Sequence, residues 1–323
     1  MKALIRTFIP NDYEQVVNVY NAALADYPIT VAEMQHEDEH YQKHSHCKCR
    51  RWIAEVEGHI VGVAEHTQRP SRFHTHRFWM DGYVHPNYQQ KGIGSALFER
   101  VIAALEPFDP VLSVCAVQED KIESVRFLKN RGLQEESRQW NSRLVLGSFD
   151  PTPYGGFENK LKTQEIELKT LAELASDPER YHKLYDLWWE LTQDVPASGG
   201  MTPTRYGFDQ FVERTFNGPN FIPDAFFIAT HKDAYVGWSD LCAGTDGAKL
   251  IRTGLTGVKR AYRRKGIALA LKLKGIEYAQ QHGYETIETS NASINRPMLS
   301  INETLGFEKQ PAIIVYKKFF KEG

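Results

Sequence analysis

One long segment occurs twice in this sequence, and the repeat limits the folds open to the chain more than any other feature. Residues 84–97 read VHPNYQQKGIGSAL and residues 258–271 read VKRAYRRKGIALAL, so the same residue types recur 174 positions apart. The same spacing of 174 relates Gly132 to Gly306. Solenoid repeats are only about 20–50 residues long, so a period of this length indicates two copies of one domain.

Length and local composition predict where the two copies meet. A chain of 323 residues is long enough for two domains of ordinary size. Residues 147–156 are dense in Pro and Gly, which interrupt regular structure, and they indicate a linker. We therefore expect domains over residues 1–150 and 160–323, with Leu144–Leu146 as the last strand of the first copy.

Each copy alternates strand-like and helix-like segments. In the first copy, a hairpin over residues 51–64 precedes a strand over about 78–84, a glycine-containing loop and a helix over about 94–105. The second copy repeats this order, with a strand that ends at Val258 and a helix over 268–281. Strands and helices at these intervals predict the α/β class, with an α+β mixed sheet in each copy.

The loop between that strand and that helix has the composition of an anion-binding site. It reads Q-x-x-G-x-G from Gln89 and R-x-x-G-x-A from Arg263. Glycine lets the backbone approach a ligand closely, and the N–H groups of a first helical turn attract an anion such as a diphosphate. The dinucleotide pattern G-x-G-x-x-G and the phosphate-loop pattern G-x-x-x-x-G-K-[ST] are both missing, which argues against those two nucleotide-binding folds.

This loop, with the strand before it and the distal Gly-Leu or Gly-Phe pair, resembles the acetyl-CoA motif of the GNAT (GCN5-related N-acetyltransferase) superfamily. Both copies resemble that family over nearly their full length, and residues 289–307 are similar to the C-terminal domain of tandem GNAT enzymes. The resemblance implies two tandem GNAT acyl-CoA N-acyltransferase domains that use acetyl-CoA (coenzyme A). It also implies that two parallel strands diverge and that pantetheine lies between them.

The resemblance further assigns cofactor-binding residues to both copies. In the second copy these are Thr256, Gly257, Val258, Arg263, Arg264, Lys265, Gly266, Ile267, Ala268, Asn291 and Asn295. In the first copy they are Tyr83, Val84, Gln89, Gln90, Lys91, Gly92, Ile93, Gly94 and Ser95. Main-chain N–H groups at the strand ends would stabilise the oxyanion that forms as an amine attacks the thioester.

The two loops differ in charge. The formal net charge of the chain is only -2, which argues against a nucleic-acid partner. The loop of the second copy is nevertheless strongly basic, with Lys259, Arg260, Arg263, Arg264 and Lys265, whereas the first has only Lys91. Such a cluster suits the phosphates of CoA, although a solvated basic surface is the alternative. We therefore expect catalysis in the second copy and a degenerate or supporting first copy.

Many family members carry a tyrosine acid four residues before the distal glycine, and neither copy has it. Leu128 holds that position in the first copy and Asn302 in the second. Tyr316 on the last strand is a candidate substitute acid, with an aromatic core residue as the alternative. The missing tyrosine keeps a second hypothesis open, a non-catalytic protein that binds or senses acetyl-CoA.

A base must accept the proton of the incoming ammonium group. A spacing of 175 relates Glu65 to Asp240, just after the third strand of each copy and facing the expected acceptor cleft. Either residue is a candidate base, and a surface carboxylate is the alternative for each. Asp81 and Glu288, on strands beside the cleft, are further candidates.

Two other segments invite a functional interpretation. Residues 40–49 contain His40, His44, His46, Cys47 and Cys49. Their spacing matches no four-ligand zinc pattern, so we expect no metal there but a mobile, partly exposed loop on the substrate side. Residues 194–203, which are rich in Gly and Pro, predict a long flexible connection over the acceptor side of the second copy.

Composition limits the setting in which the protein works. The sequence has no stretch of about 18 uncharged apolar residues and no signal-peptide pattern at its start. Four cysteines in this length suit a reducing compartment. We expect a cytoplasmic monomer or homodimer, without membrane or nucleic-acid partners, whose acceptor is a small-molecule or peptide amine.

Overall fold

The structure is a computed structural model that describes residues 3–244 and 249–321. The chain divides into two compact units. Unit 1 comprises residues 1–137, 197–204 and 314–323, and unit 2 comprises residues 138–196 and 205–313. Each unit therefore includes residues from both sequence repeats, because the chain passes between the units more than once.

The sheet of unit 1 has the strand order β1-β2-β3-β4-β5-β13. Neighbouring strands are antiparallel from β1 to β4, and β4 and β5 are parallel. The strands are β1 (Leu4–Thr7), β2 (Cys49–Val56), β3 (His59–Thr67), β4 (Arg77–Val84), β5 (Leu112–Gln118) and β13 (Ile313–Phe319). The helices of this unit are α1 (Tyr13–Ala23), α2 (Val31–Gln42), α3 (Ile93–Leu105) and α4 (Ile122–Lys129).

The sheet of unit 2 has the corresponding order β7-β8-β9-β10-β11-β6, with β12 beside β6. Here β10 and β11 are the parallel pair, and the other pairs are antiparallel. The strands are β6 (Gln134–Val145), β7 (Ile166–Thr170), β8 (Phe221–His231), β9 (Ala234–Ala243), β10 (Leu250–Val258), β11 (Thr286–Ala292) and β12 (Glu308–Lys309). The helices are α5 (Phe157–Lys162), α6 (Arg180–Thr192), α7 (Phe208–Phe216), α8 (Ile267–Gln281) and α9 (Arg296–Thr304).

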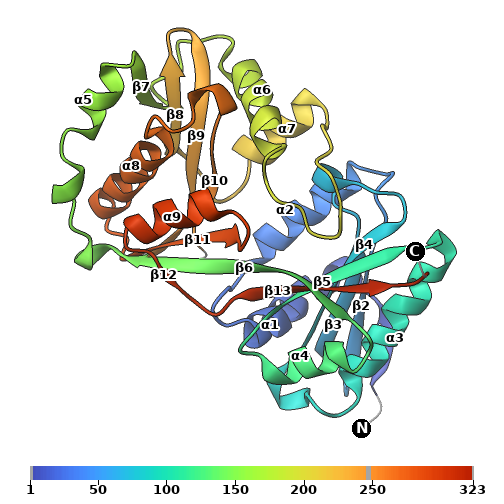
Figure 1. The fold of residues 1–323 in the computed structure, drawn as a ribbon. Helices are drawn as coiled ribbons and strands as arrows, with labels where there is room; N and C mark the ends of the chain where they lie inside the picture. Colours follow the sequence, from blue (N-terminus) through green and yellow to red (C-terminus); the bar gives the residue numbers. More distant parts are fainter. Residues whose placement is uncertain (1–2, 245–248, 322–323) are drawn as a thin grey trace. The chain divides into compact units, whose positions relative to one another are not determined.

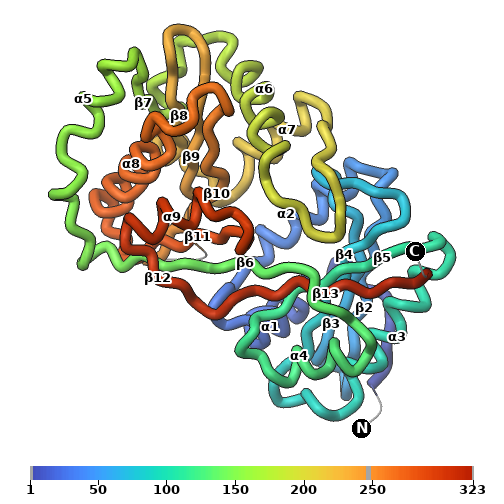
Figure 2. Tube along the Cα trace, in the orientation of Figure 1, coloured from blue at the N-terminus to red at the C-terminus, as the bar shows by residue number. Residues whose placement is uncertain are grey.

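Helices cover both faces of each sheet because side chains alternate along a strand. In unit 1, Trp52 packs with Leu97 of α3, whereas its neighbour Ile53 packs with Val16 of α1. In unit 2, α8 packs on one face of β8–β10 and α6 and α7 pack on the other, as Figures 1 and 2 show. The predicted mixed α/β fold is thus confirmed in both units.

The last strand of each sequence repeat joins the sheet formed mainly by the other repeat: β6 joins the sheet of unit 2 and β13 joins the sheet of unit 1. Residues 139–145 of β6 pair with β11 from Ala292↔Gln139 to Thr286↔Val145, and Figure 1 shows green β6 beside red β11. In return, β13 lies beside β5, and its Ile314 and Tyr316 enter the core of unit 1. The strand predicted near Leu144 exists, but it pairs in unit 2, because a strand pattern does not specify the edge that it joins.

Residues 197–204 of the connection from α6 to α7 pack into unit 1, and not over the acceptor side of the second copy as predicted. Met201 is 2% exposed and contacts Trp79 and Val114. Arg77 Nη1 donates to the carbonyl oxygen of Gly199 at 2.6 Å. Burial and hydrogen bonding of this kind hold a segment rich in glycine and proline in one conformation.

Residues 40–49 lead from α2 into β2 and are partly exposed, as predicted. His40 lies in the last turns of α2, and Cys49 begins β2. Both His44 and Cys47, between these elements, are buried. None of the helices in the described ranges is long and apolar enough to cross a bilayer.

Candidate functional site

In each unit the two parallel strands separate partway along their length. The ladder between β10 and β11 stops at the pair Arg252↔Glu288, although β10 continues to Val258 and β11 to Ala292. The ladder between β4 and β5 likewise stops at Trp79↔Val114, before either strand ends. Beyond these pairs the backbone of each strand can bind an extended ligand, as in strand addition.

The loop that follows β4 or β10 has the same backbone conformation in both units. The φ angles are 58° at Gln90 and 82° at Gly92, and 64° at Arg264 and 85° at Gly266. A left-handed conformation costs a residue with a side chain about 1–2 kcal/mol, so its recurrence at Gln90 and Arg264 indicates a geometry set by the whole loop. The helix begins directly afterwards, and its first N–H groups are those that suit a diphosphate.

The first side chain of the loop motif braces the loop in both units. Gln89 Nε2 donates to the carbonyl oxygen of Val84 at 3.0 Å. Arg263 Nε donates to the carbonyl oxygen of Val258 at 3.0 Å. Gln89 and Arg263 therefore make equivalent hydrogen bonds, and each bond connects the loop to the last residue of the preceding strand.

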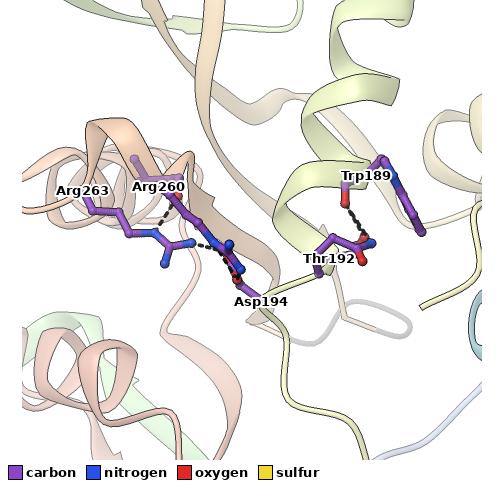
Figure 3. Close-up of polar contacts among 7 residues, drawn as sticks. Trp189, Thr192, Asp194, Arg260 and Arg263 are labelled. Carbon is purple, nitrogen blue, oxygen red and sulfur yellow. Dashed lines mark hydrogen bonds and ion pairs between the residues drawn. The ribbon is translucent and has the colours of Figure 1, made fainter. Parts of the chain in front are cut away.

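The basic loop of unit 2 has an acidic partner that the sequence did not reveal. Figure 3 shows Asp194, just after α6, against Arg260 and Arg263. Arg260 Nε donates to Asp194 Oδ1 at 3.1 Å, and Arg263 also donates to this carboxylate. These hydrogen bonds lower the pKa of Asp194. Two of the five cations predicted to bind phosphate are thus paired here, whereas Arg264 and Lys265 form no ion pair with the described residues.

A bulge in β10 receives the side chain of Asp240. The register between β10 and β9 shifts between Thr253 and Thr256. The Leu255 N–H in this bulge donates to Asp240 Oδ1 at 2.9 Å, and the Trp238 indole N–H donates to the same oxygen at 2.7 Å. The carboxyl group is thereby fixed beside the stretch of β10 that separates from β11.

Burial raises the pKa of Asp240 to about 6, against the lowering effect of the N–H groups of Trp238, Leu255 and Asp240 itself. No basic side chain contributes to this shift. The carboxylate is therefore ionised at neutral pH but a stronger base than an exposed aspartate. A base with its pKa close to the working pH suits proton transfer.

Gly254 makes room for this carboxyl group. A Cβ at residue 254 would lie 2.0 Å from Asp240 Oδ2, closer than any real contact. Sequence reasoning missed this residue, because a single glycine in a strand is at most a weak indication of a bulge.

The equivalent carboxyl group of unit 1 has different surroundings. Arg51 Nε donates to Glu65 Oε2 at 2.6 Å, and Arg51 also binds Asp38. Burial raises the pKa of Glu65, although the positive charge of Arg51 lowers it. Asp81 on β4 pairs directly with Glu65 on β3, and burial raises the pKa of Asp81 as well. The register of β3 with β4 has no shift, so β4 offers no bulge to hold a carboxyl group.

Two of the other predicted catalytic residues already have structural partners. Glu288 is 6% exposed; Arg143 Nη2 lies 2.5 Å from its Oε1 and Arg252 Nε lies 3.7 Å from its Oε2. Tyr316 is 1% exposed in the core of unit 1, beside Trp52 and Phe78. The packing of Tyr316 supports the core interpretation, since its ring belongs to unit 1 rather than to the strands of unit 2.

The remaining predicted cofactor residues lie along the loops and strand ends. Thr256 Oγ1 is 2.9 Å from Ser239 Oγ, and a Cβ at Gly257 would lie 3.0 Å from Leu191. Asn291, on the diverging part of β11, accepts a hydrogen bond from Asn302, and Asn295 precedes α9.

In unit 1, Tyr83 packs against Tyr20, Lys91 Nζ donates to the Asn87 carbonyl oxygen and Ser95 accepts from Arg131. Val84, Val258, Ile93, Gly94, Ile267 and Ala268 complete the loops and helix starts.

The described ranges contain no group of three or more His, Cys, Asp or Glu side chains placed to hold a metal ion.

Separating parallel strands, followed by a helix that begins at a left-handed glycine, define an acyltransferase fold in each unit. A sequence model of the acetyltransferase (GNAT) family matches residues 16–133 and 181–307. The chain belongs to this family, and it has two GNAT domains, as the repeat predicted.

Proteins named as acetyltransferases or as GNAT proteins are similar to most or all of the chain. Mycothiol acetyltransferase of Thermobifida fusca (strain YX) is 24% identical in an alignment of 256 residues that covers 74% of this chain and 74% of that protein. The solved structure of a tandem GNAT protein from the clavulanic acid biosynthesis pathway has a TM-score of 0.74 at 19% identity, covering 100% of both chains. A GCN5-related N-acetyltransferase from Sphaerobacter thermophilus has a TM-score of 0.68 at 16% identity, covering 99% of this chain and 96% of that one.

Proposed function

We propose that this protein is an acetyl-CoA-dependent N-acetyltransferase that acetylates a primary amine of a small molecule or peptide, with unit 2 as the catalytic unit. The observation that carries the proposal is Asp240, a partly buried carboxyl group held in the bulge of β10 where β10 and β11 separate. Unit 1 has no such bulge, and an arginine is bound to its equivalent Glu65.

The loop of unit 2 supports binding of the acyl donor. The N–H groups of residues 264–269 are at the start of α8, where they and the helix dipole favour a diphosphate. Arg264 and Lys265 add positive charge for the phosphates. Acetyl-CoA, when bound, supplies an acetyl group activated as a thioester.

The reaction then requires that the acceptor amine is held beside the thioester and that the amine loses one proton. Unit 2 holds the acceptor amine beside the diverging strands, and Asp240 accepts its proton directly or through a water molecule. A pKa of about 6 leaves Asp240 ionised at pH 7. Main-chain N–H groups near Gly257 and Val258 stabilise the oxyanion as the amine attacks.

We propose a supporting role for unit 1. Its loop has the same backbone angles as that of unit 2 but carries glutamines where unit 2 carries arginines. The loop of unit 1 therefore offers less positive charge to the phosphates of acetyl-CoA, and acetyl-CoA should bind there more weakly than in unit 2.

The acceptor is proposed only as a class. The Thermobifida fusca relative is a mycothiol acetyltransferase by name, but at 24% identity over 74% of the chain we do not transfer its substrate. The cytoplasm is the proposed location, since four cysteines in 323 residues do not make a disulfide scaffold and suit a reducing compartment.

A thiol-release assay over an amine library, run on the full chain with acetyl-CoA, tests the proposal. We expect release with at least one primary amine, loss of release in Asp240→Asn, and retained release in the unit 1 variant Glu65→Gln. Arg264→Glu should weaken acetyl-CoA binding in calorimetry. Binding without release from any amine would instead support the non-catalytic sensor, and absence of binding would exclude both functions.

A further inference from the structure

A row of charged side chains crosses the sheet of unit 2 beside Asp240. Arg252 on β10 pairs in register with Cys242 on β9 and with Glu288 on β11, and Glu288 pairs with Arg143 on β6. Residues that pair across neighbouring strands point to the same face of a sheet. The row therefore places two guanidinium groups and one carboxylate on one face.

This row lies on the same face of the sheet as the carboxyl group of Asp240. The residues that alternate with the row belong to the core on the side of α8, and they are Ile251, Ile287 and Leu144. Since side chains alternate along a strand, the row lies on the opposite face, where Trp238 packs with α6 and α7. Asp240 is on this face as well, because it accepts the hydrogen bond of the Trp238 indole N–H.

The row also begins close to the proposed base. The carboxyl group of Asp240 lies over Gly254, since a Cβ at residue 254 would be 2.0 Å from its Oδ2. Arg252 is two residues before Gly254 in the same strand, a separation of about 7 Å. The ladder between β10 and β11 ends at the pair Arg252↔Glu288, so the row marks the start of the stretch where the strands separate.

Positive charge is in excess in this row. Arg143 donates from Nε and Nη2 to Glu288 Oε1, at 3.0 and 2.5 Å, and its Nη1 donates to no described residue. Arg252 Nε lies 3.7 Å from Glu288 Oε2. Glu308, beside Arg143 in register, forms no ion pair with the described residues. Glu288 is buried, whereas the side chains of Arg143 and Arg252 are 40% and 28% exposed, so both cations are open to a ligand.

The same place in unit 1 is apolar and filled. Because the bulge adds one residue to β10, the last ladder pair of unit 2 corresponds to Trp79↔Val114. Met201 packs on both of these residues, and Val315 of β13 completes the cluster. Apolar side chains therefore suffice to close this place in the fold. Charged residues in unit 2 need another reason, because a buried ion pair adds little to stability.

Resting on the proposed function, we propose that the acceptor of unit 2 carries an anionic group, a carboxylate or a phosphate, in addition to its amine, and that Arg143 and Arg252 bind this group. Guanidinium groups suit both anions, because two of their N–H groups can pair with two oxygen atoms at once. Glu288 holds the two arginines in place. With the anion bound at the row, the amine of the acceptor is directed toward Asp240.

The exchanged strand supplies part of this site. Arg143 belongs to the first sequence repeat, yet β6 carries it into the sheet of unit 2. The second repeat by itself would have Arg252 and Glu288 without Arg143, and the excess of positive charge would be lost. Strand exchange therefore contributes directly to recognition of the acceptor.

Matched acceptors test this assignment by thiol release from acetyl-CoA with the full chain. The pairs are 4-aminobutanoate with 4-aminobutanamide, and O-phosphoethanolamine with ethanolamine, so the two pairs distinguish a carboxylate from a phosphate. In at least one pair, kcat/KM should be about 10- to 100-fold higher for the anionic acceptor, as expected for hydrogen bonds to a charged group. The difference should lie in KM, because the row binds the acceptor and does not touch the reacting atoms.

Arg143→Gln should lower kcat/KM for the anionic acceptor about 10- to 100-fold and leave that of the neutral acceptor unchanged. Arg252→Gln should have the same effect. It is the second variant in case the first does not fold, because it keeps the closer pair of Arg143 and Glu288.

Lys249→Gln is the matched control, because Lys249 also pairs with an acid, Glu285, but precedes β10 and is outside the row. It should change neither kcat/KM nor the preference for an anion. Equal kcat/KM for the anionic and neutral acceptors in the wild type would overturn the inference and leave the proposed function intact. A preference that persists in Arg143→Gln and in Arg252→Gln would also overturn it, since the anion would then bind elsewhere. No thiol release with any amine would contradict the proposed function itself, and this inference with it.

Discussion

In the bulge of β10, the carboxyl group of Asp240 fills the space that a side chain at residue 254 would need. The carboxyl group of Asp240 fills the position where a side chain on residue 254 would begin, 2.0 Å from Oδ2. The bulge and the carboxyl group therefore depend on each other, since Asp240 also accepts the Leu255 N–H of the bulge.

Gly254→Ala should remove activity by displacing Asp240. Forcing a methyl group into this space should destabilise the protein by about 1–3 kcal/mol and lower kcat/KM about 10- to 100-fold, because the base moves away from the amine. Steady-state thiol release and thermal unfolding measure both effects. Gly147→Ala is the control, because nothing lies within 4 Å of a Cβ at residue 147. Equal activity in both variants would show that the position of Asp240 does not matter.

The pKa of Asp240 predicts the pH dependence of activity. Since burial raises this pKa to about 6, kcat/KM should fall as the pH drops through 6 and the carboxylate is protonated. Asp240→Asn can keep both hydrogen bonds from Trp238 and Leu255, so it should fold but lose at least about 100-fold in rate. A rate profile without an acidic limb near pH 6 would contradict this.

The same carboxyl group should lower stability at neutral pH. Its pKa in the folded protein, about 6, is above the ordinary value of 3.8, so the folded state gains stability as the pH falls from 7 to 4. At pH 8, Asp240→Asn should therefore be more stable than the wild type by about 1–3 kcal/mol. Denaturant unfolding at pH 8 and pH 4.5 tests this, and the difference should shrink at the lower pH.

Asp194 should compete with phosphate for the basic loop of unit 2. Asp194→Asn would release Arg260 and Arg263, so we expect CoA to bind about 3- to 10-fold more tightly and with a steeper dependence on salt. Asp186→Asn, which breaks a similar pair with Arg205 away from the loop, should leave CoA binding unchanged. Calorimetry at two salt concentrations measures this. Weaker binding in Asp194→Asn would mean that Asp194 shapes the loop instead.

Met201→Ala tests whether the connection between α6 and α7 belongs to unit 1. Met201 is buried against Trp79, Leu112 and Val114, so its truncation should cost about 2–4 kcal/mol and increase hydrogen exchange in β4 and β5. Val195→Ala, at a residue that is 38% exposed, should have little effect. Unchanged exchange in β4 and β5 would contradict the packing of this segment.

Much of the fold could be predicted from local patterns. The loops at Gly92 and Gly266 and the helices after them form as expected, because left-handed turns and helix starts depend on neighbouring residues. The pairing of strands could not be predicted, since β6 and β13 are ordinary strands whose partners lie about 145 and 200 residues away in the chain. A repeat in sequence therefore does not imply that each copy completes its own sheet.

The candidate site divides in the same way. The sequence by itself determined that one fold occurs twice, that each copy has an anion-binding loop, and that only the second loop is strongly basic, because these properties lie in short contiguous motifs. Only the tertiary structure decided that Asp194 neutralises part of that charge and that Asp240 enters a bulge beside Gly254. The reason is physical: burial, desolvation and ion pairing depend on which distant residues meet, and a motif contains no information on its surroundings.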